Sequence, residues 1–422
     1  MAKILAIKAR QILDSRGNPT IECELKVGSG KVIASVPSGA SKGKNEALEL
    51  RDGGKAYMGL GVEKAVKNIN NKIAKKIIGK NPENQQQIDE IMLKLDATKN
   101  KTKLGANAIL AVSIATAKAG AQAKGIPLYE HIAEIYGNKK PSLPVPSFNI
   151  INGGKHAGNN LEIQEYMIQP TGARRFSEAL QIGSEIYHTL KKILQDKYSK
   201  QAVNVGDEGG FAPPMNNIEE PLTLIQEATA ERGYTKKIKL AIDAAATTFW
   251  RNRNYYLDGE EYTPAELAAK YEELVKKHPL ISIEDPFQEE DFTNFAKLTK
   301  KLKKTQIVGD DLLVTNPYRV QKAIVQKSCN CLLLKINQIG TLTEALEAAR
   351  IAKTAKWNIM VSHRSGETND NFIADLAVGI GAQEIKAGAP CRGERLSKYN
   401  QLLRIEEELG KKAKYIGKYR IE

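Results

Sequence analysis

The sequence predicts an α/β protein in which a barrel of strands and surrounding helices follows a smaller N-terminal α+β domain. Between residues 237 and 388, six short apolar runs alternate with helical patterns, which is typical of βα units and a parallel sheet. Successive runs end roughly 23 to 41 residues apart, about the length of a strand, a helix and two loops. With 422 residues, the chain is long enough for a barrel and a second domain.

The N-terminal part has the pattern of three strands followed by helices. Turn residues separate strand-like segments at 3–13, 20–27 and 31–36. A loop of small residues at 37–43 is expected to lead into a short helix at 45–51. Apolar residues at helical spacing predict further helices at 62–78, 85–95, 104–123 and 128–136. A polar, proline-rich segment at 137–146 follows, so we expect domains at 1–137 and 138–422.

The barrel domain is expected to begin with two strands and two helices before the regular pattern starts. The strands are predicted at 145–151 and 163–170, and the helices at 176–198 and 218–232. The six regular runs follow at 238–243, 280–285, 306–311, 331–337, 358–364 and 384–386. A polar-aromatic hairpin is predicted at 249–262, a helix starting at Thr263-Pro264, and a last helix at 393–409.

Each regular run ends in a residue that can do chemistry: Asp243, Glu284, Asp310, Lys335, His363 and Lys386. In a barrel of parallel strands, the C-terminal strand ends meet at one face, where active sites lie. A single acid there is more often a helix cap, but three carboxylates in one mouth repel one another unless a cation neutralises them. Oxygen ligands of this kind suit Mg²⁺. Strand alternation favours Glu284 and Asp310 over their neighbours Asp285 and Asp311.

The remaining candidates suggest an anionic substrate. Lys335 ends a very apolar strand, where a buried lysine near cations can act as a base. Arg364 and Ser365 lie in a loop suited to phosphate. His156 lies in a glycine-rich loop that can form a lid, and Glu208 is flanked by glycines that permit close backbone approach, although both patterns also suit ordinary turns.

Composition restricts the compartment and the partners. The net charge is +14 and the pI about 9.3, but the lysine pairs are scattered, so we expect nucleic acid to be at most a secondary partner. Four cysteines in so long a chain do not make a disulfide framework, and the CxC at Cys329 and Cys331 is interpreted as two small hydrophobic side chains rather than a metal pair. No signal-peptide core and no run of membrane-spanning length is present, and a cytoplasmic protein is predicted.

Nine motifs distributed along the chain resemble those of the enolase family. They are SGASKG (38–43), INGGKHAG (151–158), QEYM (164–167), VGDEGGFAP (205–213), SIEDPF (282–287), VGDDLLVTNP (308–317), LLLKINQIGT (332–341), VSHRSGET (361–368) and IKAGAP (385–390). One departure is Lys42, where the family usually has Thr. The resemblance implies a modified (β/α)8 barrel of order ββαα(βα)6 behind an N-terminal α+β domain, at least a homodimer, and the Mg²⁺-dependent reversible dehydration of 2-phosphoglycerate to phosphoenolpyruvate.

The resemblance also implies a role for each site residue. Asp243, Glu284 and Asp310 would hold one Mg²⁺, and Ser41 would ligate a second that arrives with the substrate. Lys335 would be the base and Glu208 the acid, in keeping with the established chemistry of this superfamily, in which a Lys or His base works with one or two Mg²⁺. The residues that contact substrate would be His156, Gln164, Glu165, Glu284, Asp310, His363, Arg364, Ser365 and Lys386.

Two other interpretations remain open from the residues alone. One is another metal-dependent abstraction of an α proton, as in a racemase or cycloisomerase, against which the phosphate-type loop at 363–366 argues. The other is an inactive structural or polyanion-binding protein, against which the complete set of site residues argues.

Overall fold

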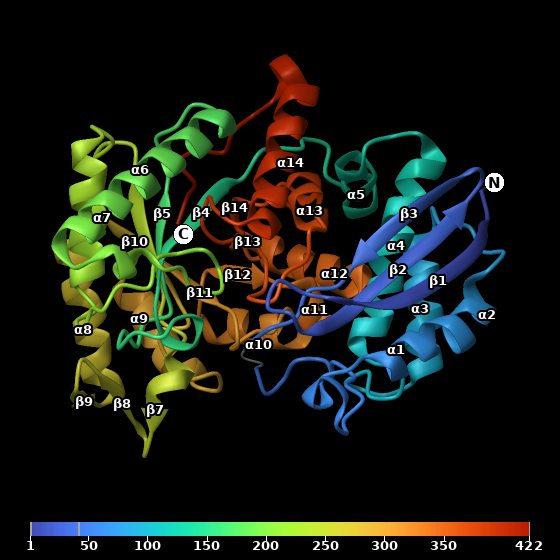
Figure 1. Ribbon diagram of the computed structural model, residues 1–422, viewed down its shortest axis with the longest axis horizontal. Helices are drawn as coiled ribbons and strands as arrows, with labels where there is room; N and C mark the ends of the chain where they lie inside the picture. The colour runs from blue at the N-terminus through green and yellow to red at the C-terminus, as the bar shows by residue number, and fades with distance from the viewer. Residues whose placement is uncertain (1, 41–42, 422) are drawn as a thin grey trace.

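Eight strands close into a barrel (Figure 1). The computed structural model describes residues 2–40 and 43–421. Around the barrel, the strands follow one another in the order β10 (Leu280–Glu284), β11 (Gln306–Gly309), β12 (Cys331–Leu334), β13 (Asn358–Ser362), β14 (Glu384–Lys386), β4 (Val145–Asn152), β5 (Glu165–Gln169) and β6 (Lys239–Asp243). Strand β5 is antiparallel to both neighbours, and the other pairs are parallel.

The order of strands and helices confirms the expected ββαα(βα)6 barrel. Strands β4 and β5 precede α6 (Phe176–Lys197) and α7 (Glu220–Glu231), and each later strand of the barrel is followed by at least one helix. The later helices are α8 (Pro264–Lys277), α9 (Phe292–Lys301), α10 (Pro317–Gln326), α11 (Ile336–Ile339), α12 (Leu342–Thr354), α13 (Phe372–Ile380) and α14 (Gly393–Leu409). Thr263 caps α8 through a capping box with Glu266, as the Thr-Pro signal predicted.

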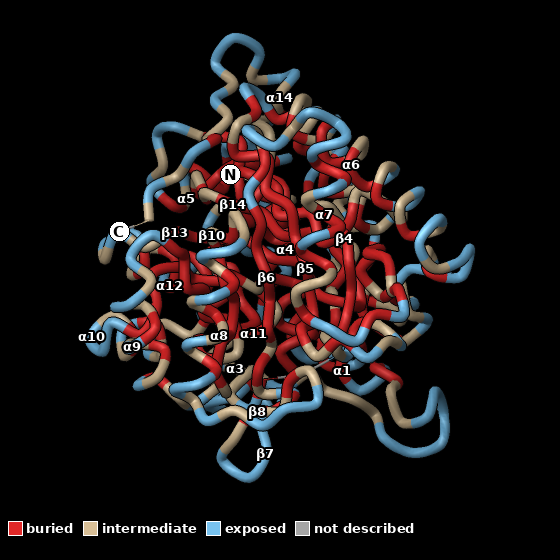
Figure 2. The backbone as a smooth tube through the Cα atoms, turned by 90° about the vertical axis from the view of Figure 1, so that its left-hand side faces the viewer, coloured by how far each residue is buried: buried red, intermediate tan, exposed pale blue. Residues whose placement is uncertain are grey.

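Most strands of the barrel are buried along their whole length, which explains their near-continuous apolar sequences (Figure 2). Alternate residues face the barrel interior and form layers. The middle layer includes a small apolar cluster of Val308, Cys331, Leu333 and Met360. The polar side chains of the interior therefore gather above and below this cluster, at the two ends of the barrel.

The N-terminal unit is a three-stranded antiparallel sheet packed on helices, on the right of Figure 1. Its strands are β1 (Ile4–Leu13), β2 (Pro19–Val27) and β3 (Gly30–Ser35). Its helices are α1 (Glu63–Asn68), α2 (Ala74–Ile77), α3 (Gln85–Asp96), α4 (Ala106–Lys124) and α5 (Leu128–Tyr136). The predicted helix at 62–78 is interrupted, because a π-helical turn (Ile69–Ile73) separates α1 from α2.

Two local predictions are wrong. The segment 45–51 is not a helix, because its backbone bonds to distant segments: the Ala47 N–H donates to Gln338 O, and the Leu48 N–H donates to Asn100 O. The hairpin at 249–262 has three strands, not two: β7 (Trp250–Arg251), β8 (Asn254–Leu257) and β9 (Glu260–Tyr262).

The C-terminal segment packs at the lower end of the barrel, where the parallel strands begin. Its backbone pairs with the linker before β4, where the Leu143 N–H donates to Lys414 O and the Ile416 N–H donates to Leu143 O. The Tyr415 hydroxyl then donates to Pro170 O over 2.9 Å. Within residues 2–40 and 43–421, none of the helices combines the length and apolarity needed to cross a membrane.

Candidate active site

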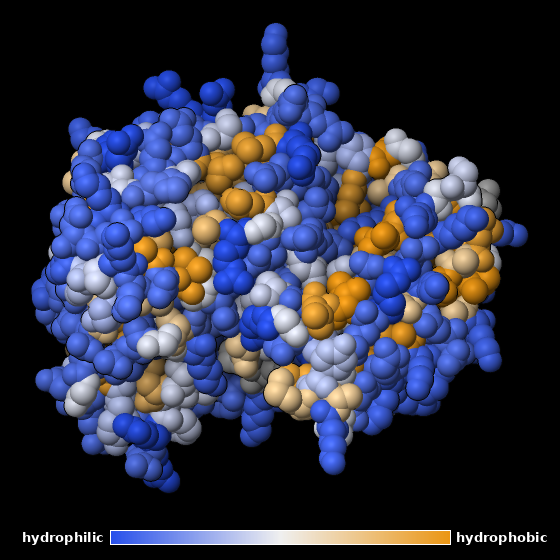
Figure 3. Space-filling model, in the orientation of Figure 1, coloured by the Kyte–Doolittle hydropathy of each residue, from blue (hydrophilic) through white to orange (hydrophobic). Residues whose placement is uncertain are grey.

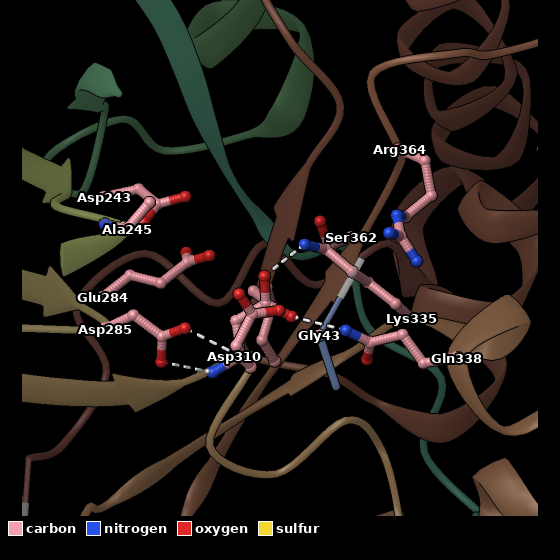
Figure 4. Close-up of polar contacts among 12 residues, drawn as sticks. Gly43, Asp243, Ala245, Glu284, Asp285, Asp310, Lys335, Gln338, Ser362 and Arg364 are labelled. Atoms are coloured by element: carbon pink, nitrogen blue, oxygen red, sulfur yellow. Dashed lines mark hydrogen bonds and ion pairs between the residues drawn. The ribbon is translucent and has the colours of Figure 1, made fainter. Parts of the chain in front are cut away.

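The polar strand ends meet at the C-terminal face of the barrel, its upper end. Asp243, Glu284 and Lys386 are the last residues of β6, β10 and β14, and Asp243 and Glu284 are partners in register. Asp310, Lys335 and His363 follow directly after β11, β12 and β13. Figure 4 shows Asp243, Glu284 and Asp310 directed toward one shared space.

Lys386 is the centre of the first charged group. Its side chain is buried, and its Nζ lies 2.8 Å from Glu284 Oε2, 3.1 Å from Glu165 Oε2 and 3.3 Å from Asp243 Oδ2. Burial alone would lower the pKa of Lys386, but these carboxylates outweigh it and raise the pKa well above its usual range. Lys386 is therefore a permanent positive charge at neutral pH.

Lys335 is paired with a different carboxylate. Its Nζ forms an ion pair with Asp310 Oδ2, while Gln338 Nε2 donates to Asp310 Oδ1 over 2.8 Å (Figure 4). Burial acts to lower the pKa of Lys335, but Asp310 more than offsets it, so the pKa is raised. A lysine that acts as a base is favoured by a lowered pKa, whereas the carboxylate of Asp310 stabilises the ammonium form of Lys335.

The carboxylates at this face have the chemistry that a hard cation requires. Oxygens of Asp243 and Glu284 converge, since both lie within 3.3 Å of Lys386 Nζ, and Asp310 faces the same space. A second acidic group brings one oxygen each of Asp285, Asp310 and Asp311 within 4.8 Å of one another. However, both Asp285 oxygens accept backbone N–H groups, from Asp310 at 2.9 Å and from Asp311 at 2.7 Å, so Asp285 holds the loop in place.

A third group consists of two carboxyls and a histidine on the opposite wall. His156 Nδ1 lies 3.7 Å from Glu165 Oε1 and 3.5 Å from Glu208 Oε1. Burial and the neighbouring Glu208 raise the pKa of Glu165 well above its usual range. Burial acts on Glu208 in the same direction, but His156, His363 and Arg395 outweigh it and lower the pKa of Glu208 well below that range. The two neighbouring carboxyls are therefore shifted in opposite directions, the pKa of Glu165 upward and the pKa of Glu208 downward.

Glycine explains how the Glu208 loop approaches so closely. A Cβ atom on Gly206 would lie 2.3 Å from His156 O, and Gly209 has φ +85°. The loop is fixed from two sides, because Asn149 Nδ2 donates to Glu208 Oε2 over 2.9 Å and the Tyr187 hydroxyl donates to Gly209 O over 2.8 Å. The glycines beside Glu208 therefore let the backbone of this loop pack close to its neighbours. This is the first of the two interpretations that the sequence allowed, the other being an ordinary turn.

The predicted phosphate loop is joined to the N-terminal unit. Arg364 forms a bidentate ion pair with Glu46, at 2.9 and 3.1 Å. The Ala40 N–H donates to Ser365 Oγ over 2.7 Å, and Ser38 and Gly366 exchange two backbone hydrogen bonds. Residues 38–40 and Glu46 therefore reach across to the barrel face, while the predicted metal ligand Ser41, with Lys42, lies outside the described residues.

One narrow cavity, of about 30 Å³, brings nearly all described candidates together. It is lined by His156, Gln164, Glu165, Glu208, Asp243, Asp310, Lys335, His363, Arg364, Ser365 and Lys386. Glu284 is the exception, since it is buried against Lys386 and does not line the space. Asp285 and Asp311, which strand alternation excluded, do line it.

Four residues that support the site were not identified from the sequence. Asn149 donates a hydrogen bond to Glu208, and Gln338 donates one to Asp310. Arg395 contacts His363, and Glu46 forms an ion pair with Arg364. Asn149 could have been predicted as a site residue, because it is a polar residue inside an otherwise apolar strand. Glu46 and Arg395 gave none, because they contact residues 318 and 32 positions away in the chain.

Comparisons with known proteins agree over the whole chain. A family model described as "Enolase, C-terminal TIM barrel domain" matches residues 140–422, and one described as "Enolase, N-terminal domain" matches residues 4–132. The enolase of Solanum lycopersicum is 54% identical over 434 aligned residues, which cover 99% of this chain and 98% of that protein.

Proposed function

The chain belongs to the enolase family, and from this premise we propose a role for each charged residue of the barrel mouth. The protein is a phosphopyruvate hydratase, a lyase that reversibly dehydrates 2-phosphoglycerate to phosphoenolpyruvate in glycolysis and, in reverse, in gluconeogenesis. The reaction needs a base at the carbon next to the carboxylate and an acid at the leaving hydroxyl.

The observation that carries the assignment is the placement of these groups on opposite walls. Lys335 follows β12 and Glu165 begins β5, and these strands are four steps apart in the closed ring of eight. Lys335 would take the proton from C2 on one face of the substrate. Glu208, assisted by Glu165, would deliver a proton to the hydroxyl on the other face, with His156 and Gln164 beside them.

Magnesium is the cofactor of the family, and we propose two ions per active site. Asp243, Glu284 and Asp310 would hold one, and Ser41 would contribute to the other. When bound, Mg²⁺ offsets the charge that develops on the substrate carboxylate. Lys386 adds a fixed positive charge in the same place, and Arg364 with Ser365 would bind the phosphate.

The test is a Mg²⁺-dependent assay of the ultraviolet absorbance of the enol phosphate formed from 2-phosphoglycerate. The wild-type protein should form phosphoenolpyruvate, and removal of Mg²⁺ with a chelator should abolish the reaction. Arg364→Lys should weaken substrate binding by about tenfold or more, because the bidentate fork is lost. A protein with no Mg²⁺-dependent product would refute the assignment.

We further propose that the protein is a cytoplasmic homodimer or larger homo-oligomer, with nucleic acid at most a secondary ligand. Its four cysteines are free thiols, as a reducing compartment favours. Hydrophilic residues cover most of the face in Figure 3, but apolar residues gather at its centre and right. Leu5, Leu13 and Ile33 of the N-terminal sheet are each more than 40% exposed, as expected of a surface that a partner covers. Light scattering would measure the mass.

A division into domains at 1–137 and 138–422 is also proposed. Helix α5 ends at Tyr136, Gly137 follows with φ +84°, and β4 begins only at Val145. Limited proteolysis should cut first within 137–144.

A further inference from the structure

Arg395, near the start of α14, is fully buried beside the active site. Its Nη1 lies 2.7 Å from His363 Nδ1 and donates to Arg364 O over 2.7 Å. Its Nη2 donates to Asp207 O over 2.9 Å and to Ser365 O over 2.5 Å. One guanidinium thus connects the loop of Glu208 with the loop of His363, Arg364 and Ser365.

The contact with His363 determines which ring nitrogen carries the proton. A guanidinium has only donors and remains charged at every working pH. His363 Nδ1 must therefore accept from Arg395, and the proton of the neutral ring must be on Nε2. A protonated imidazolium, which would place an N–H on Nδ1, would meet an N–H of Arg395 at this distance.

The protonated Nε2 faces the predicted acid. It lies 3.3 Å from Glu208 Oε2 and has no hydrogen-bond partner among residues 2–40 and 43–421. Glu208 Oε2 also accepts a hydrogen bond from Asn149. If His363 Nε2 carried no proton, its lone pair would point at the carboxylate oxygen, and the two would repel each other.

We propose that Arg395 is a positioning residue that fixes His363 as the neutral tautomer protonated on Nε2, so that this N–H is presented to Glu208 and the leaving hydroxyl. The proposal rests on the role of Glu208 given above. In this proposal His363 acts as a hydrogen-bond donor through Nε2, and Arg395 selects the tautomer that makes it a donor.

The surroundings of the ring keep it neutral. Burial lowers the pKa of His363 to about 4, Arg395 acts in the same direction, and Glu208 and Glu367 act against it. Glu208 lies in the loop at 204–211 and Arg395 in α14, and both contact the ring, while Glu367, in the loop after β13, acts on it through its charge. The ring should therefore not titrate between pH 5.5 and 8 in the intact protein.

The direct test is ¹⁵N nuclear magnetic resonance of protein labelled in histidine. The chain contains only five histidines, and loss of one ring signal in His363→Gln would assign His363. We expect a neutral ring with protonated Nε2 and unprotonated Nδ1 from pH 5.5 to 8. A proton on Nδ1, or an imidazolium at pH 7, would overturn the proposal even if the wild-type enzyme is fully active.

Arg395→Met removes the donors and the charge from the contact. His363 should then populate the other tautomer or titrate within this range, and kcat should fall about a hundredfold with a pH profile that gains a new ionisation. Arg392→Met is the matched control, because Arg392 also binds the Glu208 loop, at Gly206 O over 3.3 Å, without contacting His363. It should leave the His363 signals unchanged.

A loss of activity in Arg395→Met with unchanged His363 signals would show that the arginine only supports the loops, and would refute the proposal. If Arg395→Met does not fold, the wild-type spectrum remains decisive. An inactive wild-type enzyme with the expected spectrum would instead count against the proposed reaction and leave the tautomer assignment standing.

Discussion

The two ends of the barrel interior both contain buried polar side chains, but their hydrogen bonding differs. At the lower end, Glu384 accepts from Gln306 Nε2 at 2.6 Å, from Gln169 Nε2, and from the Tyr419 hydroxyl at 3.0 Å. Asn358 Nδ2 in turn donates to Gln306 Oε1 over 2.8 Å. Among the described residues, no buried side-chain polar atom of this group is left without a partner.

At the upper end, several buried polar atoms are left unpaired within the described chain. The atoms without a hydrogen-bond partner are Asn149 Oδ1, His156 Nδ1, Gln164 Oε1 and His363 Nε2. Buried polar groups without partners cost free energy. The lower network is thus satisfied by the protein itself and fixes the strands, while the upper one has bonding capacity left for a substrate.

The largest expected difference between the two ends of the barrel concerns Glu208, the proposed acid at the upper end. Glu208→Gln should reduce kcat by about a thousandfold, because the amide cannot donate the required proton. Stability should change little, since the amide oxygen can still accept from Asn149. Steady-state kinetics and urea unfolding measure the two effects, with Asp207→Asn as a neighbouring control. A large loss of stability would mean that the upper network is structural too.

At the lower end of the barrel we expect the opposite: a substitution should reduce stability and leave activity almost unchanged. Glu384→Leu should cost about 4 kcal/mol of unfolding free energy, because the amides of Gln169 and Gln306 and the Tyr419 hydroxyl all lose the carboxyl that accepts from them. The specific activity of the folded variant should remain close to that of wild type. Full stability with lost activity would contradict the division between the two ends.

The charge state of Glu384 gives a pH test of the same network. Burial raises its pKa from 4.5 to about 7, so the folded state holds a proton that the unfolded chain releases above pH 4.5. The contribution of Glu384 to stability is greatest at low pH and is lost as pH rises through about 7, a change on the order of 3 kcal/mol. Glu384→Gln should remove this slope in urea titrations at several pH values, and an unaltered slope would show that Glu384 is not its source.

His131 tests whether unpaired polar atoms always indicate function. It is fully buried in α5, and neither ring nitrogen has a partner among the described residues. Burial lowers its pKa to about 4, with Lys124 acting in the same direction. The unfolded ring takes up a proton below pH 6.5, so stability should fall as pH drops from 6.5 to 4. His131→Leu should flatten that fall without changing kcat. Reduced kcat would give His131 an unexpected functional role.

Local patterns in the sequence were sufficient for the barrel and for most of the site. Strand-end acids such as Asp243 and the lysines after β12 and at the end of β14 were visible because charge is unusual there. Glu384 and Gln306 also border apolar runs, but nothing in the sequence distinguishes a satisfied polar network from a reactive one. That difference depends on partners supplied by other strands and by the C-terminal segment.

The predictions that failed also depend on contacts between segments far apart in the chain. The predicted helix at 45–51 did not form because its backbone N–H groups bond to residues near 100 and 338. Arg395 was not recognised because an arginine at the start of a helix is normally exposed, and its burial against His363 depends on how α14 meets the barrel.

Lys335 and Glu208 are proposed to act in separate steps from opposite walls. Exchange of the C2 proton of 2-phosphoglycerate in heavy water, measured together with water elimination, separates the two steps. Glu208→Gln should retain exchange while it loses elimination, because the base is intact. Lys335→Ala should lose both. An equal loss of exchange in the two variants would contradict this division of roles.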